Sequence, residues 1–128
     1  MGSNLDLSNV NVYNNTSDLF GAGNDCASGA TITMNNGEIY SNTGVNGGGM
    51  YLSANNVELN NLNIYHNVAD YGGGVYAEMC MGTTQFTNCN ICENTANFDG
   101  DGFYIKVEMM PFTINMIGCT VCDEIFEF

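Results

Sequence analysis

The sequence predicts an all-β protein, a right-handed parallel β-helix that forms a three-sided solenoid of about five coils, each of about 25 to 30 residues. Two observations lead to this prediction: a short motif recurs at nearly constant spacing, and a glycine motif follows it in constant phase. A third observation excludes helices, because Asn and Gly interrupt every apolar run before a helical period is established.

The first motif is an aliphatic residue, Tyr or Cys, a variable residue, Asn, and then Thr or Val. Its copies are Val12–Thr16, Ile39–Thr43, Ile64–Val68 and Ile91–Thr95, with a degenerate fifth copy at Val121–Ile125. The aliphatic residues stand at positions 12, 39, 64, 91 and 121, so the steps are 27, 25, 27 and 30. Equivalent residues of successive coils stack about 4.8 Å apart. We therefore expect a structural ladder of amides formed by Asn15, Asn42, Asn67 and Asn94.

The second motif is a glycine pair followed by an apolar residue and Tyr. It reads Gly48-Gly49-Met50-Tyr51 and, one repeat later, Gly73-Gly74-Val75-Tyr76, with weaker copies at Asp101-Gly102-Phe103-Tyr104 and around Gly21-Ala22-Gly23. Glycine permits a positive φ and close approach of backbones. We expect these glycines to form a corner of the solenoid.

Composition limits the partners. The chain has 14 acidic residues against one lysine, Lys106, and no arginine, which gives a formal charge of −13. Nucleic acid and anionic membrane surfaces require basic residues, so neither is an expected partner. No apolar stretch of about 18 residues is present, so we expect no membrane insertion by this chain.

Together the two motifs resemble the repeats of polymorphic outer membrane proteins, which carry Phe-x-x-Asn and Gly-Gly-Ala followed by an aliphatic residue. Segments such as Ile39–Asn42 match the first motif with an aliphatic residue in place of Phe. Gly48-Gly49-Met50 and Gly73-Gly74-Val75 match the second without its Ala. The resemblance covers most of residues 5–125. It implies a cell-surface adhesin in which the β-helix is the passenger.

Six cysteines include two Cys-x-x-Cys pairs one repeat apart, which register places as Cys89 over Cys119 and Cys92 over Cys122. Stacked Cα atoms near 4.8 Å fit a disulfide, so both pairs are candidate cross-coil disulfides. The alternatives are reduced cysteines and a zinc site. The zinc site is less favoured, because the two cysteines of each Cys-x-x-Cys motif face opposite sides of a strand. No stacking partner is evident for Cys26 and Cys80.

Other residues have a functional and a structural interpretation. Asp99 and Asp101 lie in a segment with the spacing of a calcium loop that Glu108 would complete. A polar corner is the favoured explanation, calcium is the weaker alternative, and no other cofactor is expected. Tyr13, Tyr40 and Tyr65 should stack on the outside, where they could bind sugars or simply stabilise the sheet. His66 is expected to be solvated. A threonine rank for binding ice is interrupted by Val68.

An enzyme is not expected. A polysaccharide lyase of this fold typically uses a basic residue, and Lys106 stands alone. Glu93 and Asp123 align one coil apart, as a glycosidase pair would require, but no cleft-forming insertion surrounds them. We therefore expect a structural or adhesive rod that presents an acidic, Asn-rich face. A carbohydrate-binding or carbohydrate-active β-helix is the alternative.

The setting expected from the resemblance is extracellular or at the cell surface. The even cysteine count agrees, and so do two overlapping N-glycosylation sequons in Asn14-Asn15-Thr16-Ser17. Partners would be a protein or glycan at a surface, or further copies bound through open coil edges. We expect residues 1–128 to form one β-helix domain, a fragment of a longer solenoid.

Overall fold

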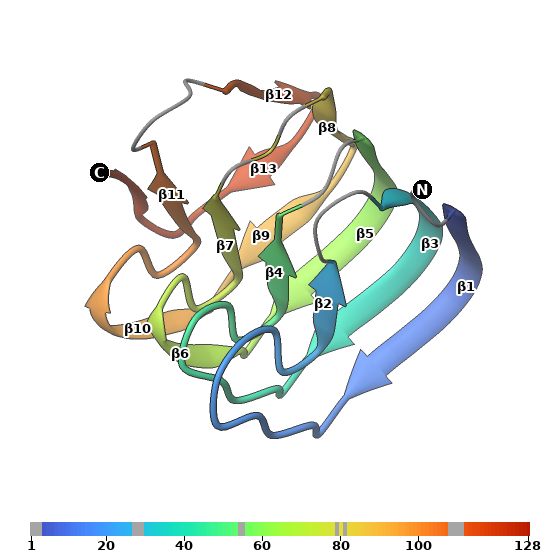
Figure 1. Cartoon of the computed structure of the whole chain (residues 1–128). Helices are drawn as coiled ribbons and strands as arrows, with labels where there is room; N and C mark the ends of the chain where they lie inside the picture. Colours follow the sequence, from blue (N-terminus) through green and yellow to red (C-terminus); the bar gives the residue numbers. More distant parts are fainter. Residues whose placement is uncertain (1–3, 27–29, 54–55, 79, 81, 108–111) are drawn as a thin grey trace.

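The computed structural model describes residues 4–26, 30–53, 56–78, 80, 82–107 and 112–128. Across these ranges the chain is all-β and winds as a right-handed parallel β-helix of about four turns (Figure 1), which confirms the predicted fold class. The prediction of about five coils was slightly high, because the five passes of the chain enclose about four complete turns. Within the described ranges, no helix is long and apolar enough to span a membrane.

The strands form three parallel sheets, one for each side of the solenoid. The first sheet contains β1 (Asn4–Tyr13), β3 (Thr31–Tyr40), β5 (Asn56–Tyr65), β8 (Thr84–Thr87), β9 (Asn90–Cys92), β12 (Ile114–Ile117) and β13 (Thr120–Val121). The second contains β6 (Val68–Tyr71) and β10 (Thr95–Asp99). The third contains β2 (Asn24–Cys26), β4 (Met50–Leu52), β7 (Val75–Glu78), β11 (Phe103–Lys106) and β14 (Ile125–Glu127).

Pairing follows the repeat register. Tyr40 lies beside Tyr13 on one side and Tyr65 on the other, and Ile39 beside Val12 and Ile64. The same inward column continues through Ile91 to Val121. Side chains of one column therefore pack in direct contact along the axis, and Ile39, Ile64 and Ile91 are fully buried. A neighbouring column ends in Phe86 and Met116, so one continuous core runs through the coils.

Three columns of residues with left-handed backbone form the corners. The first bends the long sheet and comprises Asn9, Asn36, Asn61, Asn88 and Gly118. The second occupies the variable position of the first motif and comprises Asn14, Ser41, His66 and Glu93. The third comprises Gly21, Gly47, Gly72 and Gly100. Asparagine and glycine adopt this conformation more readily than other residues. The abundance of Asn and Gly in this sequence therefore has a local cause.

Candidate functional site

The amide ladder is the best-defined polar feature of the interior. The Asn67 Oδ1 atom accepts hydrogen bonds from the backbone N of Asn42 at 3.1 Å and from its Nδ2 at 3.0 Å. The Nδ2 atom of Asn67 donates onward to Asn94 Oδ1 at 3.0 Å and back to the Ile39 carbonyl at 2.9 Å. Asn15 joins through its Nδ2 at 3.0 Å from Asn42 Oδ1. The structure therefore places all four predicted asparagines in one hydrogen-bonded column.

The glycine motif packs against this ladder. A Cβ atom at Gly49 would lie 2.6 Å from the Gly74 carbonyl oxygen and 3.1 Å from Asn67 Nδ2. A Cβ atom at Gly74 would meet the Gly102 carbonyl oxygen at 2.7 Å and Asn94 Nδ2 at 3.1 Å. The constant phase of the two sequence motifs follows from this contact. Positive φ belongs instead to the preceding residues, Gly47 and Gly72.

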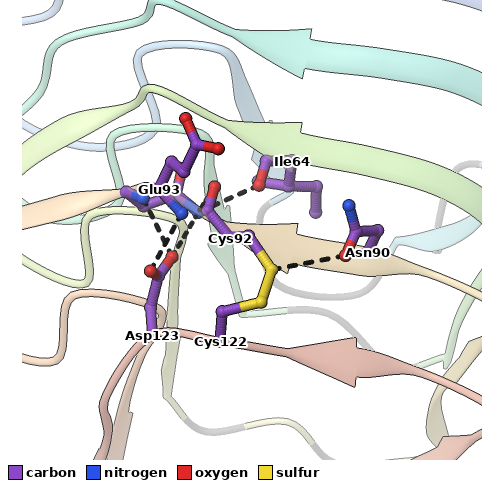
Figure 2. The surroundings of a disulfide bond; sticks show 7 residues. Ile64, Asn90, Cys92, Glu93, Cys122 and Asp123 are labelled. Carbon is purple, nitrogen blue, oxygen red and sulfur yellow. Dashed lines mark hydrogen bonds between the residues drawn. A yellow bond between two sulfur atoms is a disulfide. The ribbon is translucent and has the colours of Figure 1, made fainter.

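Asp123 closes the ladder at the last coil. Its Oδ2 accepts hydrogen bonds from Asn94 N at 2.9 Å and Asn94 Nδ2 at 3.0 Å, and its Oδ1 accepts one from Glu93 N at 2.9 Å (Figure 2). In the motif, the Asn position would fall on Glu124. The chain instead omits the variable corner residue, so that Asp123 follows Cys122 directly into the ladder. The Asp123 carboxylate therefore accepts hydrogen bonds from Asn94 and from the Glu93 backbone N, and it does not pair with the Glu93 carboxylate.

The cysteine prediction is right for one pair and wrong for the other. Cys92 and Cys122 form a disulfide with Cα atoms 4.9 Å apart (Figure 2). Cys89 and Cys119 stack in register but remain free thiols, so a Cys89–Cys119 disulfide is excluded in this structure. Each thiol donates to a core-side carbonyl: Cys89 Sγ to Leu59 O at 3.3 Å, and Cys119 Sγ to Phe86 O at 3.3 Å. The Cys89 backbone N also donates to Cys119 Sγ at 3.4 Å, and burial raises the pKa of Cys89.

The remaining cysteines, Cys26 and Cys80, are both buried in the core. The Cys80 Sγ atom lies 3.7 Å from the Leu52 carbonyl oxygen. Burial, with smaller contributions from Asp25 and Cys80, raises the pKa of Cys26 to about 12. A thiol with the raised pKa of Cys26 is protonated and unreactive at neutral pH.

The calcium candidates are not gathered into a ligand cluster. Asp101 Oδ1 accepts a hydrogen bond from Ala96 N at 2.7 Å, so this carboxylate braces the turn. Asp99 ends β10 beside Tyr71. Glu108 lies outside the described residues. In the part of the chain that the structure describes, no three His, Cys, Asp or Glu side chains are grouped so that they could hold a metal.

Tyr13, Tyr40 and Tyr65 form the expected outer aromatic column. Their ring centroids are 5.0 and 5.1 Å apart and their planes differ by 7° and 6°. Stacked in this way, the middle ring, Tyr40, has both faces covered by its neighbours, whereas Tyr13 is stacked on one side only and is 51% exposed. Sugars that stack on aromatic faces would find few available. His66 is exposed and its Nε2 lies 2.6 Å from Glu93 Oε2, one coil away.

A second aromatic column was not among the features predicted from the sequence. Tyr51, Tyr76, Tyr104 and Phe126 stack on the outer face of the third sheet with centroids 5.5, 5.1 and 5.2 Å apart. The three tyrosines are each less than 10% exposed. Tyr51 donates to the carboxylate of Glu78, which lies 3.9 Å from Lys106 Nζ. The tyrosine that ends each glycine motif was a usable signal for this column.

Comparison with known protein families, with curated proteins and with solved structures finds no match for the chain.

Proposed function

We propose that this chain is a non-catalytic, rigid segment of an extracellular or cell-surface protein, a passenger or spacer rod with a structural or adhesive role. The observation that carries the proposal is the use of the polar and reactive side chains between coils. The Asn ladder, the Cys92–Cys122 disulfide and the Asp123 carboxylate all join one coil to the next. Their chemistry supports rigidity rather than turnover.

The disulfide supports the extracellular setting, because structural disulfides persist mainly in oxidising compartments. The resemblance to polymorphic outer membrane protein repeats supports an adhesive passenger. The acidic surface, with formal charge −13, supports protein or glycan partners over nucleic acid. The Tyr13–Tyr40–Tyr65 column offers few free ring faces for glycan recognition, which favours the structural function for these residues.

The test uses two measurements on the purified, oxidised chain. Hydrogen exchange followed by mass spectrometry is expected to show slow exchange in β3, β5 and β9 alike, since a rod has no weak coil in its interior. The Asn67→Ala variant, which removes one amide of the ladder, serves as the comparison and is expected to exchange faster. Fast exchange confined to one interior coil of the unmodified chain would contradict the rod.

A second measurement addresses the carbohydrate-active alternative. The chain is incubated with a panel of neutral and acidic polysaccharides, and new reducing ends and unsaturated products are quantified. We expect neither. If the unmodified chain releases product and Glu93→Gln or Asp123→Asn does not, the structural proposal is wrong and the chain is a glycosidase that uses this pair.

A further inference from the structure

We propose that Asn14 is an N-glycosylation site and that Asn15, which belongs to an overlapping sequon, is not. The inference rests on the proposed extracellular setting, because the oligosaccharide is transferred in a secretory compartment. The sequons are Asn14-Asn15-Thr16 and Asn15-Thr16-Ser17, which sequence alone cannot separate. The positions of the two asparagines in the coil do separate them.

Asn14 stands in the second corner column, whose members all point to solvent. Its φ is 57°, and the equivalent residues Ser41, His66 and Glu93 have φ values of 55°, 54° and 61°. All four are exposed, including those in interior coils with neighbours on both sides. The exposure of Asn14 is therefore lateral and does not depend on whether another coil covers the first one. The variety of side chains in this column agrees with an open position.

Asn15 stands in the ladder column; it is exposed in the first described coil, but it is hydrogen-bonded to the interior members of the column, which are buried. Asn42 and Asn67 are 0% exposed and Asn94 is 4% exposed. Both amide protons of Asn15 have acceptors, Asn42 Oδ1 at 3.0 Å and Tyr13 O at 3.2 Å. A sugar on Asn15 Nδ2 would replace one of these protons and insert bulk where the coils meet. A glycan at Asn15 would thus cost one of these two hydrogen bonds and crowd the first ladder contact, whereas one at Asn14 leaves every ladder contact intact.

The hydroxyl of the sequon is also accessible. Thr16 is exposed and pairs through its backbone with Thr43 of the next coil. In the transfer, Asn14 Nδ2 bonds to the anomeric carbon of a lipid-linked oligosaccharide while the bond from that carbon to the lipid pyrophosphate breaks. The amide loses one proton to a base of the transferase. No oxidant or reductant is required.

The test secretes the full chain behind a cleavable leader from a eukaryotic cell and maps the glycan by amidase treatment and peptide mass. Ser17→Ala removes only the Asn15 sequon, and Thr16→Ala removes only the Asn14 sequon. We expect the unmodified chain and Ser17→Ala to carry one glycan, on Asn14, and secreted Thr16→Ala to carry none. A glycan on Asn15 in a secreted chain with the Cys92–Cys122 bond intact would overturn the proposal, as would an unglycosylated unmodified chain.

Two added substitutions test the columns themselves. Ser41→Asn creates a sequon with Thr43 at the same corner one coil later, and in the Thr16→Ala background it should restore a single glycan. Gly44→Ser creates a sequon on the buried Asn42, and no secreted chain should carry a glycan there. The disulfide and the hydrogen-exchange pattern are measured on the same samples. If these are intact and Asn14 is unmodified, the glycosylation proposal fails while the rod proposal stands.

Discussion

At the scale of the residue, the most demanding group in the fold is the side-chain amide of Asn67. It is fully buried, donates two hydrogen bonds and accepts two. Buried polar groups that lose a partner cost roughly 1–3 kcal/mol each. The amide is therefore essential to the coil although it contributes no apolar surface.

We expect Asn67→Ala to lower the free energy of unfolding by about 2–4 kcal/mol, because Asn42 loses its acceptor and Ile39 O loses its donor. Urea unfolding measures the change. Asn63→Ala, at an exposed strand position, is the matched control and should change stability by less than about 0.5 kcal/mol. Equal effects of the two substitutions would show that the ladder is not stabilising.

A second prediction at this scale concerns the buried thiol of Cys26, whose pKa is raised from 9.0 to about 12 by burial. Above pH 9 the unfolded chain loses this proton while the folded chain keeps it. Folding stability should therefore fall between pH 9 and pH 12, by up to about 1.4 kcal/mol for each pH unit from this group. Urea titrations across this range measure the slope. Cys26→Ala should make it shallower, and an unchanged slope would assign the loss to other groups.

The sequence was sufficient for the ladder because Asn recurs at one phase of the repeat. It was insufficient to predict the position of Asp123, because the last corner omits one residue and the repeat alignment then places Glu124 in the ladder. It was also insufficient for Cys89 and Cys119. Stacked positions permit a disulfide, but the choice between a sulfur bond and the carbonyls of Leu59 and Phe86 depends on side-chain direction inside the core.

At the scale of the element, the last coil is joined to the preceding one by strand pairing, which includes β12 on β8, by the Asp123 carboxylate and by a disulfide. β13 pairs with β9, β14 pairs with β11, and the Cys92–Cys122 disulfide occupies the outer column that tyrosines fill in earlier coils. The disulfide takes the place of an aromatic stack at the same position. Repeat register predicted that these cysteines would be neighbours, and the third-sheet aromatic column could have been predicted by the same reasoning.

We expect reduction of this disulfide to lower the free energy of unfolding by about 3–4 kcal/mol, the chain-entropy value for a loop of about 30 residues. Urea unfolding with and without dithiothreitol measures the effect. In a Cys92→Ser, Cys122→Ser double variant the reductant should have no effect, because no other cysteine in the described part of the chain is in a disulfide. A remaining effect of reductant would reveal a second disulfide in solution.

At the scale of the whole molecule, stability comes from contacts between adjacent coils, as in other solenoids. Every interior coil has the same three sides, corners and ladder, so coils should be removable in whole units. The periodicity that predicted the fold also defines the unit: Ile39 and Ile64 occupy equivalent positions 25 residues apart.

Deletion of residues 40–64 joins Ile39 to Tyr65 and removes one complete coil. We expect this variant to fold, with a smaller urea m-value because less surface is buried. A control deletion one residue shorter, of residues 40–63, puts the first-sheet strand out of phase and turns its core side chains outward. It should unfold or aggregate. Circular dichroism and size-exclusion chromatography distinguish the two, and equal folding of both would refute the strict register.

The amide ladder has a further physical consequence, because every C=O group in it faces the preceding coil. The aligned amides form a small electric dipole along the solenoid axis, negative near Asn15 and positive near Asn94, in which each link polarises the next. The carboxylate of Asp123 lies at the positive pole, as an acidic residue does at the N-terminus of a helix. The molecule is therefore electrically directional. An anionic residue is favourable at one end of this column and unfavourable at the other.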